Sequence, residues 1–295
     1  MSSSEQLPPV ELEAFVLEIG GPVCRWNNAS WDHGESDVWR ADLESGAGVF
    51  VKRHRQPAKF AQERAAYERW APAVGMCPRL LAARGGDLRA LLLEAVPGEP
   101  LLVAQAPAEA EKDYYAKAGR WLGRLHDLPW KDEDAMDVAT ALAQRSVAWS
   151  ERARALQGAP LSRSVIDEVH ARVSAPWPAG VEVPARVPCH RDFTLRNWIV
   201  SGEAIHVIDF EHARPDWSLT DLERVKSSIP GERRELWDAF ETGYGRSLEP
   251  QEEKLIERLQ LHAALSRVVW AVEHEDAEFE REGREQLERL LMSSN

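Results

Sequence analysis

The sequence has no long apolar run, few cysteines and no surplus of positive charge. None of its apolar stretches approaches the roughly 20 residues that a membrane-spanning helix requires, so we expect no such helix. The first nine residues contain neither a basic nor an apolar segment, and we expect no signal peptide there. The three cysteines are scattered and lack metal-ligand spacing, which is typical of a reduced, cytoplasmic protein.

The charge balance bears on possible partners. Lys and Arg number 36 against 49 Asp and Glu, so the formal net charge is −13. Nucleic acids require clustered basic residues, and we therefore expect no nucleic-acid partner. A cationic small molecule fits the acidic balance, although solvated acidic surfaces are the commoner origin of such a charge. With 295 residues, of which 44 % are apolar, the chain can bury a sizeable core.

The most informative stretch of the sequence runs from residue 187 to residue 212. His190-Arg191-Asp192 is followed by Asn197 with the spacing His-x-Asp-x-x-x-x-Asn, and Asp209-Phe210-Glu211 comes later in the same stretch. This spacing is that of the kinase catalytic loop, with Asp-Phe-Glu in place of Asp-Phe-Gly. The alternative is a loop in which Asp and Asn side chains only cap turns.

Two short strands are predicted between these two motifs. Residues 198–200 and 205–208 are β-branched and aromatic runs, and Ser201-Gly202-Glu203 between them predicts a hairpin. The hairpin would bring Asn197 and Asp209 to the same end of two paired strands, with Asp192 one loop away.

Phosphoryl transfer requires these residue types at such a spacing. One carboxylate accepts the proton of the attacking hydroxyl, while an amide and a second carboxylate bind Mg²⁺ on the nucleotide phosphates. We therefore predict Asp192, Asn197 and Asp209 as catalytic residues. Asp192 would be the general base, and Asn197 and Asp209 would be the metal ligands.

The stretch resembles the aminoglycoside phosphotransferase family, the bacterial small-molecule kinases that share the protein-kinase fold. The resemblance extends over nearly the whole chain and implies an α+β, two-lobed, protein-kinase-like fold. Residues 1–96 would form a small nucleotide-binding lobe with an antiparallel sheet and one helix. Residues 97–295 would form a larger, mainly helical lobe, with the hinge near residues 94–99. Arg191 departs from the family pattern, which more often has Gly there, and we interpret it as an internal brace of the loop.

The N-terminal part contains a strand that ends in Lys52. Strands are predicted around residues 23–26, 38–41 and 49–52, with helices over 11–19 and 60–70. In a kinase-like lobe the strand lysine binds the α- and β-phosphates and pairs with a helix glutamate. Glu63 is the best candidate and Glu68 the alternative. Lys52 could instead be a solvated surface base.

Two further segments are expected to contact the nucleotide. The loop that includes Gly34 and Ser36 would close over the phosphates, although a plain hairpin turn is the alternative. The apolar run 88–93 leads into the hinge, where the resemblance places the base against the Glu94 carbonyl and the Val96 amide. Recognition by backbone groups leaves the choice between ATP and GTP open.

The rest of the chain has helical periodicity. Helices are predicted over residues 109–128, 134–156, 161–173, 232–244, 249–275 and 277–291. The acidic run that begins at Glu273 is either a solvated face or an anionic wall for an amine-bearing acceptor. The candidate acceptor-binding residues are Glu211, Trp217, Trp270, Glu273 and His274.

These patterns together favour one function. Only eleven residues separate Asp209 from Asp221, too few for the activation segment of a protein kinase. We predict a Mg²⁺-dependent O-phosphotransferase that moves the γ-phosphate of ATP or GTP to a hydroxyl of a small, amine-bearing molecule such as an antibiotic. A metabolic kinase of the choline, sugar or amino-sugar type and an inactive nucleotide-binding module are the alternatives.

Overall fold

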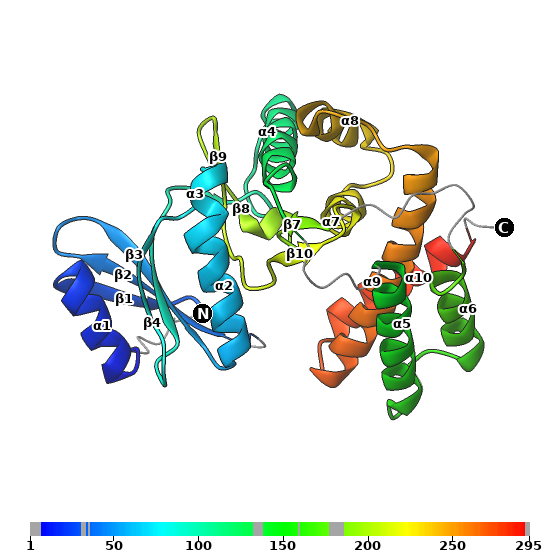
Figure 1. The fold of residues 1–295 in the computed structure, drawn as a ribbon, viewed down its shortest axis with the longest axis horizontal. Helices are drawn as coiled ribbons and strands as arrows, with labels where there is room; N and C mark the ends of the chain where they lie inside the picture. The colour runs from blue at the N-terminus through cyan, green and yellow to red at the C-terminus, as the bar shows by residue number, and fades with distance from the viewer. Residues whose placement is uncertain are drawn as a thin grey trace. The chain divides into compact units, whose positions relative to one another are not determined.

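The computed structural model describes residues 7–30, 34, 36–131, 138–158, 160–176 and 186–292 (Figure 1). The chain forms two compact units, each built from several segments. The first comprises residues 1–128, 188–214 and 228–246, and the second comprises residues 129–187, 215–227 and 247–295. The predicted lobe of residues 1–96 falls within the first unit. The division into lobes at a hinge near residues 94–99 stays a prediction.

The first unit contains a five-stranded antiparallel sheet with the strand order β1-β2-β3-β5-β4. Its strands are β1 (Val23–Asn28), β2 (Ser36–Leu43), β3 (Gly48–His54), β4 (Leu80–Arg84) and β5 (Ala90–Glu94). The predicted strands are thereby confirmed. Strand β4 was not predicted, because Leu80–Arg84 shows no alternation of apolar and polar residues, and all five residues are half-buried.

Two helices pack on the opposite faces of this sheet (Figure 1). Helix α1 (Val10–Gly20) buries Leu12, Phe15 and Val16 in one cluster with sheet residues such as Val51. Successive side chains of a strand point to opposite faces, so Lys52 faces away from α1 and toward α2 (Pro57–Arg69). Pro57 lies at the first position of α2, where its missing N–H costs no hydrogen bond. Helix α3 (Ala71–Val74) follows directly.

The predicted hairpin is also confirmed. Strands β8 (Trp198–Ser201) and β9 (Ala204–Val207) are antiparallel, and β6 (Glu99–Pro100) pairs with β8. The turn lies against α4 (Ala108–His126), because Tyr114 Oη donates to the Gly202 carbonyl at 2.5 Å and Lys117 Nζ to the Glu203 carbonyl at 2.6 Å. The remaining short elements are β7 (Val187–Cys189), the 3₁₀ helix η1 (Leu195–Asn197) and β10 (Arg214–Asp216).

The second unit is built mainly from helices. These are α5 (Val138–Ala155), α6 (Arg163–Val173), most of α7 (Leu219–Ser228), α9 (Pro250–Glu273) and α10 (Ala277–Met292). Helix α9 begins with a capping box between Glu249 and Glu252 and buries apolar residues along its whole length. The predicted helices are confirmed, although residues 134–137 of one of them lie outside the described part. Among the described helices, none combines the length and apolarity needed to cross a membrane.

Helix α4 packs unusually closely against α8 (Arg234–Tyr244) in the first unit. A Cβ atom on Gly243 would overlap the carbonyl oxygen of Ala116, and one on Gly119 would overlap that of Phe240. Backbone atoms of two helices cannot yield as a flexible side chain can. The two glycines therefore set the distance between α4 and α8.

We predict that Gly243→Ala lowers the free energy of unfolding by about 3 kcal/mol, because the methyl group forces the helices apart. Urea denaturation measures this change. Gly231→Ala is the matched control, since Gly231 has open space around it and no positive φ, and its effect should stay within about 0.5 kcal/mol. Wild-type stability of Gly243→Ala would contradict the close helix contact.

Candidate active site

Lys52 lies among three carboxylates of the first unit. Its Nζ is 2.9 Å from Glu63 Oε2, 2.6 Å from Asp209 Oδ1 and 2.9 Å from Glu211 Oε2. Lys52 is 6 % exposed and Glu63 is fully buried. The alternative glutamate, Glu68, instead pairs with Arg64 on the outside of α2. The structure therefore brings together the strand lysine and the helix glutamate that the sequence favoured.

Lys52 and the carboxylates beside it stabilise one another's charged forms. Burial by itself lowers the pKa of Lys52, but the charges of Asp209, Glu63 and Glu211 outweigh it and raise that pKa well above its usual range. Burial raises the pKa of Asp209, yet the Lys52 ammonium more than reverses this and holds it well below the usual value. The pKa of Glu211 is lowered in the same way, against the effect of burial. Lys52 is thus a cation beside ionised Asp209 and Glu211.

Glu211 is fixed by residues from three different elements. Its carboxylate contacts Lys52 of β3 and accepts a hydrogen bond from Ser36 Oγ of β2 at 3.0 Å. Its backbone carbonyl accepts a hydrogen bond from Gln62 Nε2 of α2. The side chain that we predicted as an acceptor-binding group therefore lies in the Lys52 cluster and is almost completely buried. Its contribution to acceptor binding stays a prediction.

The predicted phosphate loop is only partly described. Ser36 is buried and is the first residue of β2, and Gly34 is half-buried. Residues 31–33 and 35 lie outside the described part of the chain. The contacts that we predicted between this loop and the phosphates stay a prediction.

Asp192 and Asn197 contact each other directly. Asn197 Nδ2 donates to the Asp192 backbone carbonyl and to Asp192 Oδ2, both at 2.8 Å. Asp192 is 8 % exposed and Asn197 is 4 % exposed. Because the amide nitrogen of Asn197 is engaged, its Oδ1 is the atom that could bind a cation.

Arg196 also contacts the Asp192 carboxylate. Its Nη2 lies 3.0 Å and 3.2 Å from the two carboxylate oxygens, and about half of its side chain is exposed. The sequence analysis did not single out Arg196. Arg196 follows Asp192 by four residues in a short loop, and this spacing could have predicted the contact between the two side chains.

His190 connects the loop of residues 192–197 to the end of the hairpin. Its Nε2 donates to the Ile208 carbonyl at 3.0 Å, and its Nδ1 accepts from the Asp192 backbone N–H at 3.3 Å. One neutral imidazole tautomer satisfies both bonds. The Ile208 N–H in turn donates to the Asn197 carbonyl at 3.0 Å. Asp192, Asn197 and Asp209 are thereby held at one end of the hairpin, as the sequence predicted.

Two residues of the site have left-handed backbone. The φ angles of Arg191 and Asp209 are 65° and 67°, in a region that only glycine adopts without cost. The glycine that the family more often carries in place of Arg191 would adopt this conformation freely. The backbone of Arg191 and Asp209 is therefore strained, and the surrounding hydrogen bonds must stabilise this conformation.

His54 is a buried residue that the sequence analysis missed. It follows Lys52 by two positions in β3, so both side chains point to the same face of the sheet. His54 is fully buried, and its Nε2 lies 2.7 Å from Glu63 Oε2. The alternation of the strand was a signal that could have indicated this neighbour of the Lys52 cluster.

The predicted hinge follows β5. The Glu94 N–H donates to the Arg79 carbonyl at 2.9 Å, and the Ala95 N–H donates to the Gly48 carbonyl at 3.0 Å. The Glu94 side chain is exposed and pairs with Arg79. The binding of a nucleotide base by the Glu94 carbonyl and the Val96 amide stays a prediction.

The other acceptor candidates belong to the second unit. Trp217 is buried. Trp270 and His274 stack with their ring centroids 4.0 Å apart at the end of α9. Glu273 is paired with Arg152, whose guanidinium lies over the Trp149 ring. Trp270, Glu273 and His274 are thus neighbours, but Glu273 already has a cationic partner.

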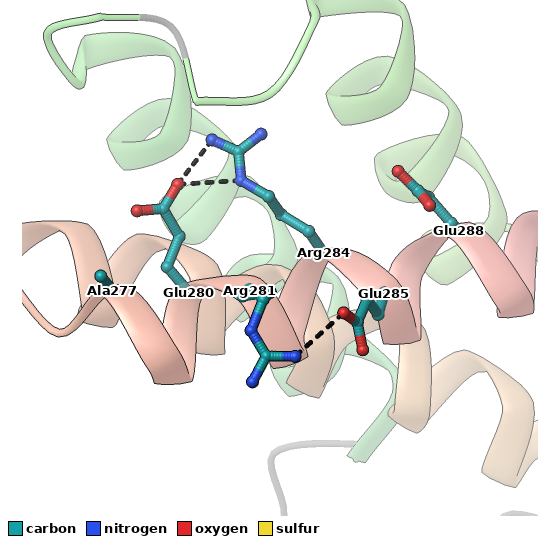
Figure 2. A pocket seen from close by; sticks show the side chains of 6 residues that line it. All are labelled: Ala277, Glu280, Arg281, Arg284, Glu285 and Glu288. Carbon is teal, nitrogen blue, oxygen red and sulfur yellow. Dashed lines mark hydrogen bonds and ion pairs between the residues drawn. The ribbon is translucent and has the colours of Figure 1, made fainter.

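The acidic residues of α10 are also largely paired with arginines. Figure 2 shows a groove along this helix in which Arg284 reaches Glu280 and Arg281 reaches Glu285. The groove is lined by residues of α10, namely Ala277, Glu280, Arg281, Arg284, Glu285 and Glu288. Such pairs are typical of a solvated helix face.

Comparison with solved structures finds the same fold in several phosphotransferases. A thermostable mutant of aminoglycoside phosphotransferase APH(4)-Ia has a TM-score of 0.73 and 13% identity, covering 96% of this chain and 99% of that chain. The GDP and kanamycin complex of APH(2")-IIia has a TM-score of 0.72 and 13% identity, with coverages of 97% and 100%. Macrolide 2'-phosphotransferase type I has a TM-score of 0.68 and 15% identity, with coverages of 97% and 99%. The predicted kinase-like α+β fold is confirmed.

The sequence comparisons give the family. No curated protein sequence matches the chain. The model of the phosphotransferase enzyme family, APH, matches residues 31–286, which is most of the chain. The resemblance seen in the catalytic motifs is thereby confirmed, and the chain belongs to the phosphotransferase enzyme family.

Proposed function

We propose that this phosphotransferase moves the γ-phosphate of ATP or GTP to a hydroxyl of a small, amine-bearing molecule, with Mg²⁺ as cofactor. The observation that carries the proposal is the Lys52 cluster beside the 192–197 loop. Lys52 contacts Glu63 and Asp209, and hydrogen bonds connect Asp209's strand end to Asn197 and Asp192 within one compact unit. An inactive nucleotide-binding module would have no need of this complete set.

Each residue has a role that its surroundings support. Asp192 would accept the proton of the attacking hydroxyl, since a general base must lie within hydrogen-bond reach of that hydroxyl. Lys52 would bind the α- and β-phosphates, and Glu63 would hold its ammonium in place. His190 would position both Asp192 and the end of the hairpin through its two ring nitrogens.

The residues around Lys52 fit a divalent cation. Three carboxylates surround one ammonium, so acidic groups outnumber basic ones around Lys52, and the Asp209 side chain is 37 % exposed and within reach of a cation. Asn197 and Asp209 offer the amide and carboxylate oxygens that Mg²⁺ prefers. When bound, Mg²⁺ would neutralise the charge that develops on the phosphoryl group.

The identity of the nucleotide stays open between ATP and GTP. Solved structures with this fold include a streptomycin–ATP–APH(2")-IIa complex and a GDP and kanamycin complex. A hinge that reads the base through backbone atoms suits either nucleotide. The Lys52–Glu63 pair supports the proposal that this chain also binds a nucleotide.

The acceptor is proposed as a cationic molecule such as an antibiotic. The solved structures bind kanamycin, streptomycin and hygromycin B, and the net charge of this chain is −13. Glu273 would have to release Arg152 before it could meet an ammonium. A metabolic kinase for choline or an amino sugar would use the same machinery.

A nucleotide-turnover screen tests the proposal. The protein is assayed with ATP and with GTP against aminoglycosides, other antibiotics and amino-alcohols, and we expect at least one acceptor to stimulate turnover. Asp192→Ala should then reduce turnover by about 10² or more, because the general base is lost, with little change in nucleotide affinity. Asp238→Ala, on the surface of α8, is the control and should retain full turnover. Normal turnover by folded Asp192→Ala would refute the assignment.

A second prediction concerns the metal. Asp209→Ala removes a charged oxygen ligand, so the Mg²⁺-dependent part of nucleotide binding should collapse. Calorimetric titrations of nucleotide with Mg²⁺ and with EDTA measure that part. If Asp209→Ala retained the wild-type difference between the two titrations, Asp209 would not be a metal ligand.

A further inference from the structure

His54 lies on the same face of β3 as Lys52 and is completely buried. The two residues are two positions apart, so both side chains point toward α2. His54 and Glu63 are each 0 % exposed. The His54 N–H donates to the Arg89 carbonyl at 3.0 Å, and Arg89 Nε donates to the His54 carbonyl at 3.1 Å. These two bonds fix the backbone that carries the imidazole.

The imidazole faces the Glu63 carboxylate. His54 Nε2 lies 2.7 Å from Glu63 Oε2, the same oxygen that lies 2.9 Å from Lys52 Nζ. Neither ring nitrogen has another hydrogen-bond partner in the part of the chain that the structure describes. A proton on Nε2 meets a carboxylate oxygen, whereas a proton on Nδ1 alone would be a buried donor without a partner and would turn a lone pair toward the carboxylate. The imidazole therefore presents an N–H to Glu63.

Glu63 shares Lys52 with other anions. The ammonium of Lys52 also contacts Asp209 and Glu211, and in the proposed function it binds the nucleotide phosphates as well. Glu63 has no access to water, and a buried carboxylate that loses part of its compensating charge is strongly destabilised. His54 contacts Glu63 independently of Lys52, so it can hold the carboxylate while Lys52 meets the phosphates.

The surroundings of His54 would also suit a metal ligand, but a cation already occupies this place. One nitrogen of His54 and one oxygen each of Glu63 and Glu211 lie within 4.8 Å of one another. Lys52 Nζ is 2.9 Å from both carboxylates. A metal ion among these three side chains would meet the ammonium at short range, and the two positive charges would repel each other. The geometry therefore favours a role of His54 toward Glu63.

We propose that His54 is a positioning residue for phosphoryl transfer. Its Nε2–H holds the Glu63 carboxylate toward Lys52, and Lys52 is thereby directed at the nucleotide phosphates. The inference rests on the proposed function. Neither the kinase-like motifs nor the family match assigns a role to His54. It would act through Glu63 and Lys52 rather than by touching the nucleotide.

Nucleotide affinity tests the inference. Calorimetry with Mg²⁺ measures the Kd values of the β,γ-imido analogues of ATP and GTP. His54→Leu keeps the approximate size of the side chain but removes the N–H, and Kd should rise about tenfold, the usual effect of losing a hydrogen bond to a charged group. His54→Gln can place an amide N–H near the position of Nε2 and should restore Kd to within about threefold of the wild type.

A double-mutant cycle separates positioning from packing. In a Glu63→Gln background the carboxylate that His54 holds is gone, so His54→Leu should raise Kd by less than about twofold further. A residue that acts only by filling space would cost the same factor in both backgrounds. Phe60→Leu is the packing control, because the Phe60 ring packs edge-on against the His54 ring with centroids 6.2 Å apart. This variant keeps the Glu63 contact, and its Kd should stay within about twofold of the wild type.

The outcome decides the inference in either direction. If His54→Leu does not fold, His54→Asn is measured in its place, since its shorter amide does not reach the position of Nε2, and the same rise in Kd is expected. An unchanged Kd in the folded variant, or an equal rise in the wild-type and Glu63→Gln backgrounds, overturns the inference, while nucleotide binding by the wild type still supports the proposed function. A wild-type protein that binds no nucleotide overturns both.

Discussion

The Lys52 ammonium is the contact on which the rest of the site depends. It joins β3, α2 and the segment after β9 through Glu63, Asp209 and Glu211. Glu211 is buried, and the Lys52 ammonium compensates its charge, because an uncompensated buried charge costs several kcal/mol. Burial acts to lower the pKa of the lysine, and the charges of Asp209, Glu63 and Glu211 more than reverse that effect. The ion pairs of Lys52 thus hold β3, α2 and residues 209–211 together.

A second set of contacts fixes the position of the Lys52 cluster relative to residues 192–197. His190 binds both the Ile208 carbonyl and the Asp192 N–H, so the loop and the hairpin cannot move independently. The hairpin turn is bound to α4 through Tyr114 and Lys117. These hydrogen bonds hold the two left-handed residues, Arg191 and Asp209, in conformations that their side chains disfavour. Asp209 is consequently directed at Lys52 by the backbone as well as by charge.

Much of this arrangement follows from local patterns. The strand that ends near Lys52, the helix that carries Glu63 and the hairpin between Asn197 and Asp209 each have a periodicity that predicts them. Contacts between distant segments have no such pattern. Arg152 lies 121 positions before Glu273, so its ion pair with that carboxylate could not be predicted. The contacts of Glu211 with Ser36 and Gln62 could not be predicted either, because both partners come from other elements of the fold.

We propose that Asn197 and Asp209 hold a divalent cation on a nucleotide beside the Lys52 cluster. The most direct test is a crystal structure with Mn²⁺ and a non-hydrolysable ATP or GTP analogue, in which anomalous scattering locates the metal. The account predicts a manganese peak bound by Asn197 Oδ1 and a carboxylate oxygen of Asp209, with Lys52 on the phosphates. An ordered nucleotide whose manganese is bound by neither residue would contradict it.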